Sequence, residues 1–241
     1  MSQESRDTIL KNKNCFLTGA SGGIGQEIAV QMVARGCNLF LTSADEEAVK
    51  KMEGMFPGVR VVVEAGDLTK VEDVQRIIEK AKKEFGAIDI LINCAGVFPV
   101  QTLEDSTLED FEQCFGVNVQ APYLFSKAFA PGMKEQQWGR IVNIGSSSAY
   151  SGFPGTSLYC ASKHALLGLS RALYQELKEQ GIRVFCISPG SVKTEMGKKV
   201  THQDFSTFID PQEIAEYIGF VVSFDKEMVS EEIRLNRIQT Q

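Results

Sequence analysis

Histidine is scarce in this chain, which has only two, His164 and His202, among 241 residues. Two histidines far apart in the sequence leave little room for a zinc site or a serine–histidine relay, so we expect no resident metal. The six cysteines include no C-x-x-C pair and lie mostly within apolar runs. This pattern favours buried free thiols over disulfides or metal ligands.

Long apolar runs and basic clusters are also missing. No segment approaches the roughly 20 uninterrupted apolar residues of a membrane span, and residues 1–14 lack the apolar stretch of a secretory signal. We therefore expect a cytoplasmic protein with no membrane partner. The net charge is −6, and Lys and Arg form no run. The sequence thus predicts no nucleic-acid partner.

Short apolar runs alternate with longer helical patterns along the chain. The runs cover residues 15–17, 39–41, 59–63, 88–92, 141–144 and 184–187, and an alternating run at 232–238 is typical of an edge strand. The helical patterns cover residues 23–34, 71–85, 108–134 and 158–180. Strands that are apolar on both faces need helices on both sides, as in a parallel sheet.

This alternation predicts an α/β fold, a doubly wound Rossmann-type parallel sheet of about seven strands with helices on both faces. Because the sequence contains no linker, repeat or low-complexity segment, we expect one domain over residues 1–241.

A glycine-rich turn follows the first apolar run, where Thr18–Gly25 reads T-G-A-S-G-G-I-G. Glycines permit a tight turn and let the backbone approach a ligand closely. The helix that begins here offers free N–H groups and a partial positive charge to a pyrophosphate. A purely structural turn is the alternative, but the position between a strand and a helix favours phosphate binding.

Tyr159 and Lys163 stand four residues apart in a helical pattern, so that both side chains lie on one face. A free tyrosine has a pKa near ~10, and a neighbouring cation favours the phenolate and lowers that value. Such a tyrosine can exchange a proton with an alcohol or carbonyl oxygen. A serine among residues 146–148, after the fifth run, can hold the same oxygen. This tyrosine–lysine spacing also occurs by chance in helices without function.

Taken together, these motifs resemble the short-chain dehydrogenase/reductase family, and more closely its compact single-domain branch, which includes 3-oxoacyl-carrier-protein reductases. The resemblance covers about residues 13–238. It rests on the glycine turn, on the tyrosine–lysine pair and on motifs that follow in the family's order. These motifs are Asp67 after the third run, Asn93–Gly96 with Cys94 replacing the usual second Asn, Asn118, Ser146 thirteen positions before Tyr159, and Pro189–Thr194.

The resemblance implies a role for each matching residue. Tyr159 is the general acid in reduction and the general base in oxidation, and Lys163 lowers its pKa and bonds the nicotinamide ribose. Ser146 polarises the substrate oxygen, and Asn118 holds a water through a kink in its helix. The residues implied to bind the cofactor are Gly19, Ser21, Gly23, Ile24, Gly25, Ser43, Asp67, Leu68, Asn93, Ala95, Gly96, Tyr159, Lys163, Pro189, Gly190, Val192 and Thr194.

The identity of the cofactor depends on the end of the second run. An acid at the position of Ser43 would bond the ribose hydroxyls and repel a 2′-phosphate. Ser43 is small and neutral, which favours NADP(H) over NAD(H). The two basic residues common in NADP-dependent relatives are replaced by Gly22 and Ala44, whereas Asp45 can turn away as a helix N-cap.

The implied reaction is hydride transfer between the nicotinamide and a carbonyl or secondary alcohol. The stretch 195–210 is short for a substrate lid, which suggests an open cleft for a small-molecule or carrier-bound carbonyl. Candidate apolar walls are Phe98, Tyr150, Phe153, Met196 and Phe205. The alternatives are a dinucleotide-binding sensor without turnover and an epimerase or dehydratase. Residues 108–134 and 158–180 resemble the helices that relatives use to form dimers, so we expect a homodimer or homotetramer.

Overall fold

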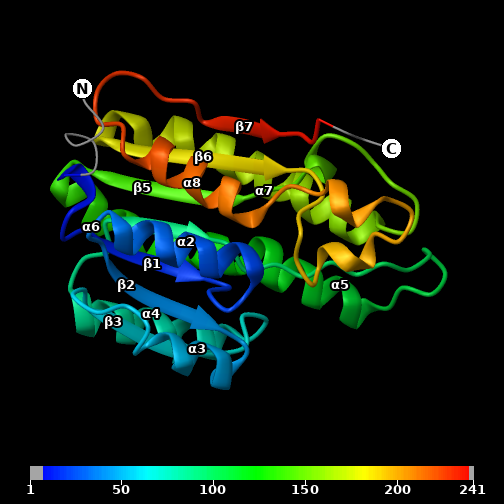
Figure 1. Cartoon of the computed structure of the whole chain (residues 1–241), viewed down its shortest axis with the longest axis horizontal. Coiled ribbons are helices and arrows are strands. Elements are labelled where there is room, and N and C mark those ends of the chain that lie inside the picture. Colours follow the sequence, from blue (N-terminus) through cyan, green and yellow to red (C-terminus); the bar gives the residue numbers. More distant parts are fainter. Residues whose placement is uncertain (1–7, 239–241) are drawn as a thin grey trace.

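The computed structural model describes residues 8–238, in which seven parallel strands form one sheet in the order β3-β2-β1-β4-β5-β6-β7 (Figure 1). The predicted doubly wound Rossmann-type fold is confirmed. Every neighbouring pair in the sheet is parallel, including the edge strand β7 against β6. The strands are β1 Asn14–Thr18, β2 Asn38–Ser43, β3 Val61–Ala65, β4 Ile90–Asn93, β5 Gly139–Ile144, β6 Ile182–Pro189 and β7 Glu232–Leu235.

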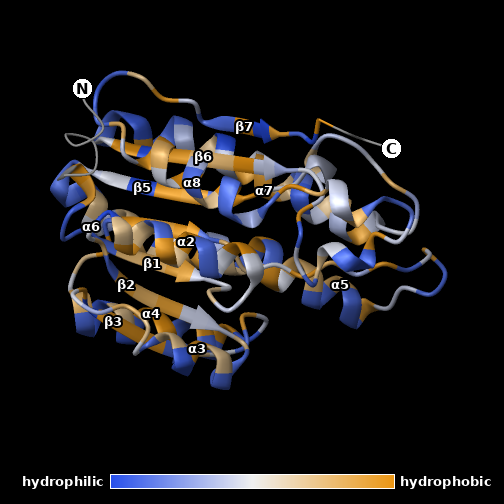
Figure 2. Ribbon diagram, viewed as in Figure 1, coloured by the Kyte–Doolittle hydropathy of each residue, from blue (hydrophilic) through white to orange (hydrophobic). Residues whose placement is uncertain are grey.

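Helices cover both faces of the sheet, because successive strand residues point to opposite sides. Leu17 of β1 packs in the layer that holds α2 and α8, whereas its neighbour Phe16 stacks on Phe40 and packs against Phe125 in the layer of α4 and α6. Figure 2 shows the strands as mostly apolar between these layers. The main helices are α2 Gly23–Ala34, α3 Glu46–Met52, α4 Val71–Phe85, α5 Leu108–Phe115, α6 Ala121–Gln136, α7 Ser157–Leu177 and α8 Pro211–Val222.

Several boundaries differ from those that the sequence predicts. β3 covers 61–65 instead of 59–63, because its residues pair with β2 from Val61 to Ala65. β4 covers 90–93 instead of 88–92, and the last strand ends at Leu235 instead of 238. The expected helix over 108–134 is interrupted by a π-helix, η2 at Gly116–Gln120. The helix α8 was missed, and α3 was anticipated only through Asp45 as a helix N-cap.

Other expectations can be compared directly with the described residues. The six cysteines are free thiols, five of them buried, as predicted. Asp45 is the N-cap of α3, because its carboxylate accepts a hydrogen bond from the Ala48 N–H at 2.9 Å. Within residues 8–238 no helix is long and apolar enough to span a membrane. The expected absence of a secretory signal concerns residues 1–14, and residues 1–7 of this stretch lie outside the described range.

Candidate active site

A large cleft opens at the carboxyl ends of the strands, where α5 and the segment between β6 and α8 extend beyond the sheet (Figure 1). Its volume is about 1200 Å³, enough for a dinucleotide together with a substrate. The glycine turn after β1 forms one wall, and the loops after β2 to β6, together with residues of α5 and α7, form the others. Ligands of open α/β sheets bind at this edge, outside the carboxyl ends of the strands.

The glycine turn has no room for a side chain at two positions. Gly19 has φ +65°, and a Cβ there would lie 2.7 Å from the backbone N of Ala95. A Cβ on Gly25 would lie 2.1 Å from the carbonyl oxygen of Gly19. The Thr18 hydroxyl also accepts hydrogen bonds from the N–H groups of Cys94 and Ala95, both at 3.0 Å. These contacts lock the turn against the loop after β4 and leave backbone N–H groups at the start of α2 facing the cleft.

Ser21 of the glycine turn lies against Ser43, the last residue of β2. The Oγ atoms of Ser21 and Ser43 are 2.6 Å apart, and the Asp45 N–H donates to Ser43 Oγ at 3.2 Å. The carboxylate of Asp45 is turned away to cap α3 and does not line the cleft. No acidic side chain therefore occupies the place where it would repel a 2′-phosphate.

Asp67 lines the cleft after β3. Its carboxylate accepts hydrogen bonds from the Thr69 hydroxyl at 2.7 Å and from the Thr69 N–H at 3.0 Å. These two hydrogen bonds lower the pKa of Asp67, so the group is an anion that can accept further hydrogen bonds at neutral pH.

Tyr159 and Lys163 lie on the first turns of α7 and line the cleft together with Ser146. The Tyr159 ring meets Phe98 edge to face, with centroids 4.6 Å apart. The Lys163 ammonium donates to the Ile144 carbonyl at 2.8 Å and lies 5.6 Å from the centroid of the Tyr159 ring. Three proton-bearing side chains therefore meet at one point of the cleft.

The pKa of Tyr159 is raised to about 12, first because burial disfavours the phenolate, whereas a hydrogen bond with Ser146 lowers it. Burial also lowers the pKa of Lys163. Burial of the phenol is the largest of these effects, and the lowering of the tyrosine pKa by Lys163 stays a prediction. The hydroxyl of Ser146 is the group that opposes this effect.

Asn118 is fully buried in the π-helix η2 and does not line the cleft. Its Oδ1 accepts a hydrogen bond from the Val97 N–H at 2.9 Å, and its Nδ2 donates to the Val97 carbonyl and the Ser162 hydroxyl, both at 3.0 Å. The Ser162 hydroxyl in turn donates to the Tyr159 carbonyl at 2.8 Å. Asn118 thus links the loop after β4 to the turn of α7 that carries Tyr159.

Asn93 also lies behind the cleft, because its side chain donates to Asn143 Oδ1 at 2.8 Å. The other predicted site residues all line the cleft: Gly19, Ser21, Gly23, Ile24, Gly25, Ser43, Asp67, Leu68, Ala95, Gly96, Ser146, Tyr159, Lys163, Pro189, Gly190, Val192 and Thr194.

Of the expected apolar walls, Phe98, Phe153 and Met196 line the cleft, whereas Tyr150 and Phe205 do not. The Tyr150 ring lies under the guanidinium of Arg234, 4.3 Å from its centroid, and Phe205 packs on Phe208. The cleft is also lined by residues that were not singled out from the sequence, among them Gln113, Val117, Lys199, His202 and Gln203. They come from segments far apart in the chain and carry no motif that could have revealed them.

A glycine turn after β1 and a tyrosine–lysine pair in the same cleft define a dinucleotide-dependent oxidoreductase. Comparison with known proteins agrees, since residues 13–204 match the family model described as short chain dehydrogenase. The chain belongs to this family. An uncharacterized oxidoreductase of Thermotoga maritima is 36% identical over 187 residues, which cover 77% of this chain and 74% of the relative.

Two solved structures share the fold. A metagenomic short-chain oxidoreductase in complex with NADP has a TM-score of 0.82 at 28% identity, covering 94% of this chain and 97% of the other. A 3-ketoacyl-(acyl-carrier-protein) reductase from Brucella melitensis, complexed with NADH, has a TM-score of 0.86 at 27% identity with the same coverage.

The family and the fold establish an oxidoreductase that acts on CH–OH or C=O groups and binds a nicotinamide dinucleotide. Within residues 8–238, no group of three or more His, Cys, Asp and Glu side chains could hold a metal ion.

Proposed function

We propose that this protein is an NADP(H)-dependent carbonyl reductase, or secondary alcohol dehydrogenase, with Tyr159 as its proton donor and acceptor. The observation that carries the proposal is that Ser146, Tyr159 and Lys163 meet in the same cleft as the glycine turn. The glycine turn fits a pyrophosphate, because Gly23, Ile24 and Gly25 line the cleft at the N-terminus of α2, where helix N–H groups favour an anion. When bound, the nicotinamide supplies or accepts the hydride.

In this mechanism the substrate oxygen accepts hydrogen bonds from the hydroxyls of Ser146 and Tyr159. Tyr159 gives its proton to that oxygen in reduction and takes it back in oxidation. A phenol with a pKa of about 12 is fully protonated at neutral pH, as a proton donor must be. The Lys163 ammonium, fixed on the Ile144 carbonyl, lies beside the ring as the next proton-bearing group.

Asn118 positions this pair without facing the cleft, because it links Val97 to Ser162, whose hydroxyl bonds the Tyr159 carbonyl. Asn93 similarly supports the loop after β4 through Asn143. We assign both residues to the support of the site.

The preference for NADP(H) rests on the serine pair at the end of β2. Ser21 and Ser43 offer hydroxyl donors, and the nearby acid Asp45 is engaged in capping α3. We expect a higher kcat/KM with NADPH than with NADH. Ser43→Asp, which introduces the missing acid, should reverse that order by lowering the NADPH value about tenfold or more. A wild-type enzyme that works better with NADH would contradict this assignment.

The substrate proposal is a small-molecule or carrier-bound carbonyl, including the 3-oxoacyl type that the Brucella melitensis relative reduces according to its name. The test is a panel of aldehydes, ketones and 3-oxoacyl thioesters, followed through NAD(P)H absorbance with both cofactors. Binding of NADPH without consumption on any carbonyl would instead support the dinucleotide sensor.

We further propose that residues 1–241 form one domain that both binds the cofactor and carries out catalysis. We also propose that the protein is cytoplasmic and assembles as a homodimer or homotetramer through residues 108–134 and 158–180, which include α5, most of α6 and most of α7. Tyr123 on α6 is an exposed aromatic side chain, of a kind that subunit contacts often bury. A monomer in light scattering at micromolar concentration would exclude the assembly.

A further inference from the structure

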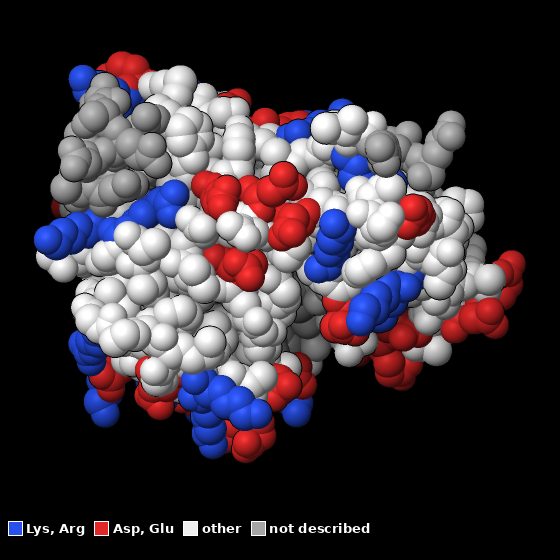
Figure 3. All heavy atoms as spheres, in the orientation of Figure 1, with Lys and Arg blue, Asp and Glu red and all other residues white. Residues whose placement is uncertain are grey.

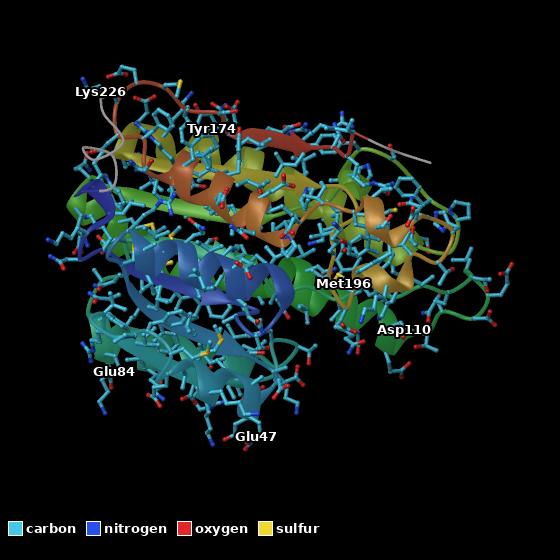
Figure 4. All side chains as sticks on the ribbon, viewed as in Figure 1. Glu47, Glu84, Asp110, Tyr174, Met196 and Lys226 are labelled. Carbon is cyan, nitrogen blue, oxygen red and sulfur yellow. The ribbon has the colours of Figure 1, made fainter. Side chains whose placement is uncertain are left out.

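The segment after β6 forms a lid over the cleft, and its backbone is fixed by tight contacts. Gly197 packs so closely on the loop after β6 that an added Cβ would lie 2.0 Å from the Val192 carbonyl oxygen. Its N–H donates to the Thr194 hydroxyl at 3.1 Å, and the Lys199 N–H donates to the Met196 carbonyl at 3.2 Å. Figure 4 shows Met196 on this segment. The lid therefore holds the backbone of Lys199 at a defined place.

The far end of the lid is tied to the C-terminal part of the chain. The Arg237 guanidinium donates to Gln203 Oε1 at 2.7 Å and to the Thr207 hydroxyl at 2.9 Å. Gln203 Oε1 also accepts a hydrogen bond from the Ser191 hydroxyl at 2.8 Å. Because both ends of the segment are anchored, Lys199 is presented to the cleft by a structured element.

The side chain of Lys199 reaches across the cleft mouth. Its Nζ lies 3.3 Å from the carbonyl oxygen of Phe98, a residue 101 positions away in the sequence. The Phe98 ring contacts Tyr159 edge to face. The ammonium is thus anchored on the residue that forms the wall beside the proton donor.

Where the lid lines the cleft, positive side chains outnumber negative ones. Lys193 and Lys199 both line the cleft, and neither forms an ion pair with any residue in the described range. The lid acid Glu195 is already paired with the neighbouring Lys198 at 2.5 Å. The other lining acid, Asp67, follows β3 and is held by Thr69. Within a protein of net charge −6, this side of the cleft is locally positive.

A neutral carbonyl at 3.3 Å is a weak partner for an ammonium. Ammonium hydrogen bonds to a carboxylate or phosphate are shorter, about 2.7–2.9 Å, and add the attraction of opposite charges, which a neutral carbonyl does not supply. An anion in the cleft could therefore displace the Phe98 carbonyl, which lies at the mouth where water can hydrate it. Phe98, Phe153 and Met196 meanwhile offer apolar surface to the body of the same molecule.

We propose that Lys199 binds an anionic group of the carbonyl substrate, a carboxylate or a phosphate, and so selects substrates with an apolar body and one negative end. This inference rests on the proposed carbonyl reductase activity. The two anions represent different sources, an oxo acid or aldehydic acid for the carboxylate and a phosphorylated or carrier-bound substrate for the phosphate.

The test compares matched pairs of aldehydes with NADPH. The carboxylate arm uses 4-formylbenzoate against its neutral methyl ester, and the phosphate arm uses 4-formylphenyl phosphate against its neutral dimethyl ester. The measured quantity is the ratio of kcat/KM for the anion to that for the ester, in which a general loss of activity cancels. We expect the wild type to favour one or both anions, mainly through KM.

Lys199→Gln should reduce that ratio about five- to tenfold, as expected for one partly exposed charge-assisted contact, whereas Lys199→Arg should retain it. Lys82→Gln is the control, because it removes the same charge from an exposed lysine of α4 that does not line the cleft. Equal kcat/KM values for the anion and its ester in the wild type would overturn the proposal. An equal fall of the anion-to-ester ratio in both Gln variants would overturn it as well.

A binding measurement keeps the inference separate from the proposed reaction. Calorimetry on the NADPH-saturated enzyme, in which an alcohol cannot be oxidised, compares 4-(hydroxymethyl)benzoate with its methyl ester. A preference for the acid that Lys199→Gln removes supports the anion site even if no aldehyde is reduced, in which case the proposed reaction fails and the site stands. If the wild type binds both compounds equally, the anion site is refuted even where aldehydes are reduced.

Discussion

At the scale of single residues, the reactive centre depends on opposing effects at one phenol. Burial raises the pKa of Tyr159 to about 12, and the hydrogen bond with Ser146 acts in the other direction. A phenol with a raised pKa carries its proton at neutral pH but is a weaker acid, so proton transfer in either direction benefits from groups that stabilise the phenolate. In this site the Ser146 hydroxyl provides part of that stabilisation in addition to holding the substrate oxygen.

Ser146→Ala should therefore shift the pH dependence of alcohol oxidation as well as slow the reaction. Because the Ser146 hydrogen bond lowers the Tyr159 pKa, its loss raises that pKa and moves the rising limb of kcat/KM against pH to higher pH. The rate at neutral pH should fall about 100-fold. Ser147→Ala, a change to the next serine of the loop, is the control. A slower enzyme with an unmoved pH profile would show that Ser146 acts on the substrate alone.

Lys163 is a buried cation, and the burial of its charge should lower the free energy of unfolding of the protein. Burial lowers its pKa in the folded protein below the unfolded value of ~10.4, so the unfolded chain binds more protons and wild-type stability rises with pH within that window. Lys163→Met should abolish turnover yet raise the free energy of unfolding at pH 7 by about 1 kcal/mol, net of the lost bond to the Ile144 carbonyl.

This gain should shrink as the pH rises through the lowered pKa of Lys163, because the wild-type lysine then loses its buried charge. Urea denaturation at several pH values measures it, with Lys83→Met on the exposed side of α4 as the control. A Lys163→Met protein that is less stable at every pH would show that the bond to Ile144 outweighs the buried charge.

At the scale of secondary structure, the strands were predictable because each is a short apolar run, and the glycine turn was predictable because it lies between a strand and a helix. The limits of β3 were not predictable from the sequence, because the pairing of Val61–Ala65 with β2 sets them. α3 is too short to show a period. The π-helix at Gly116–Gln120 depends on the tertiary hydrogen bonds of Asn118, although the kink itself was implied by the family resemblance.

Asn118→Ala tests whether this kink holds the site together. The change leaves the N–H and carbonyl of Val97 and the Ser162 hydroxyl without their partner in a buried place. Unsatisfied buried groups cost about 1–3 kcal/mol each, so we expect a loss of about 2–3 kcal/mol in the free energy of unfolding. Gln120→Ala, an exposed position of the same π-helix, should change it by less than about 0.5 kcal/mol. Equal effects would exclude a special role for Asn118.

The site itself was only partly readable from the sequence. Residues in motifs, such as Gly19, Ser146 and Tyr159, line the cleft as expected. Lys199 and Gln113 belong to no motif, and their places follow from how the lid and α5 fold over the cleft. Asn93 and Asn118 carry motifs but lie behind the surface, because a motif records that a residue is needed and not whether it faces the ligand.

At the scale of the whole molecule, parallel strands bring residues from distant parts of the chain to one edge of the sheet. The order β3-β2-β1-β4-β5-β6-β7 reverses direction between β1 and β4, where the glycine turn meets the loop at Ala95. Such a reversal is where open α/β sheets bind their ligands. Figure 3 shows charges of both signs mixed on the face it presents, with no continuous basic stripe there.

The central claim is that Tyr159 exchanges the proton with the substrate oxygen. Its most direct test is the rate of carbonyl reduction by Tyr159→Phe, measured beside the affinity for NADPH by fluorescence titration. The loss of one hydroxyl should slow reduction at least about 100-fold, while NADPH binding through the glycine turn stays within about threefold of the wild type. A Tyr159→Phe enzyme that reduces the same carbonyl as fast as the wild type would contradict the mechanism.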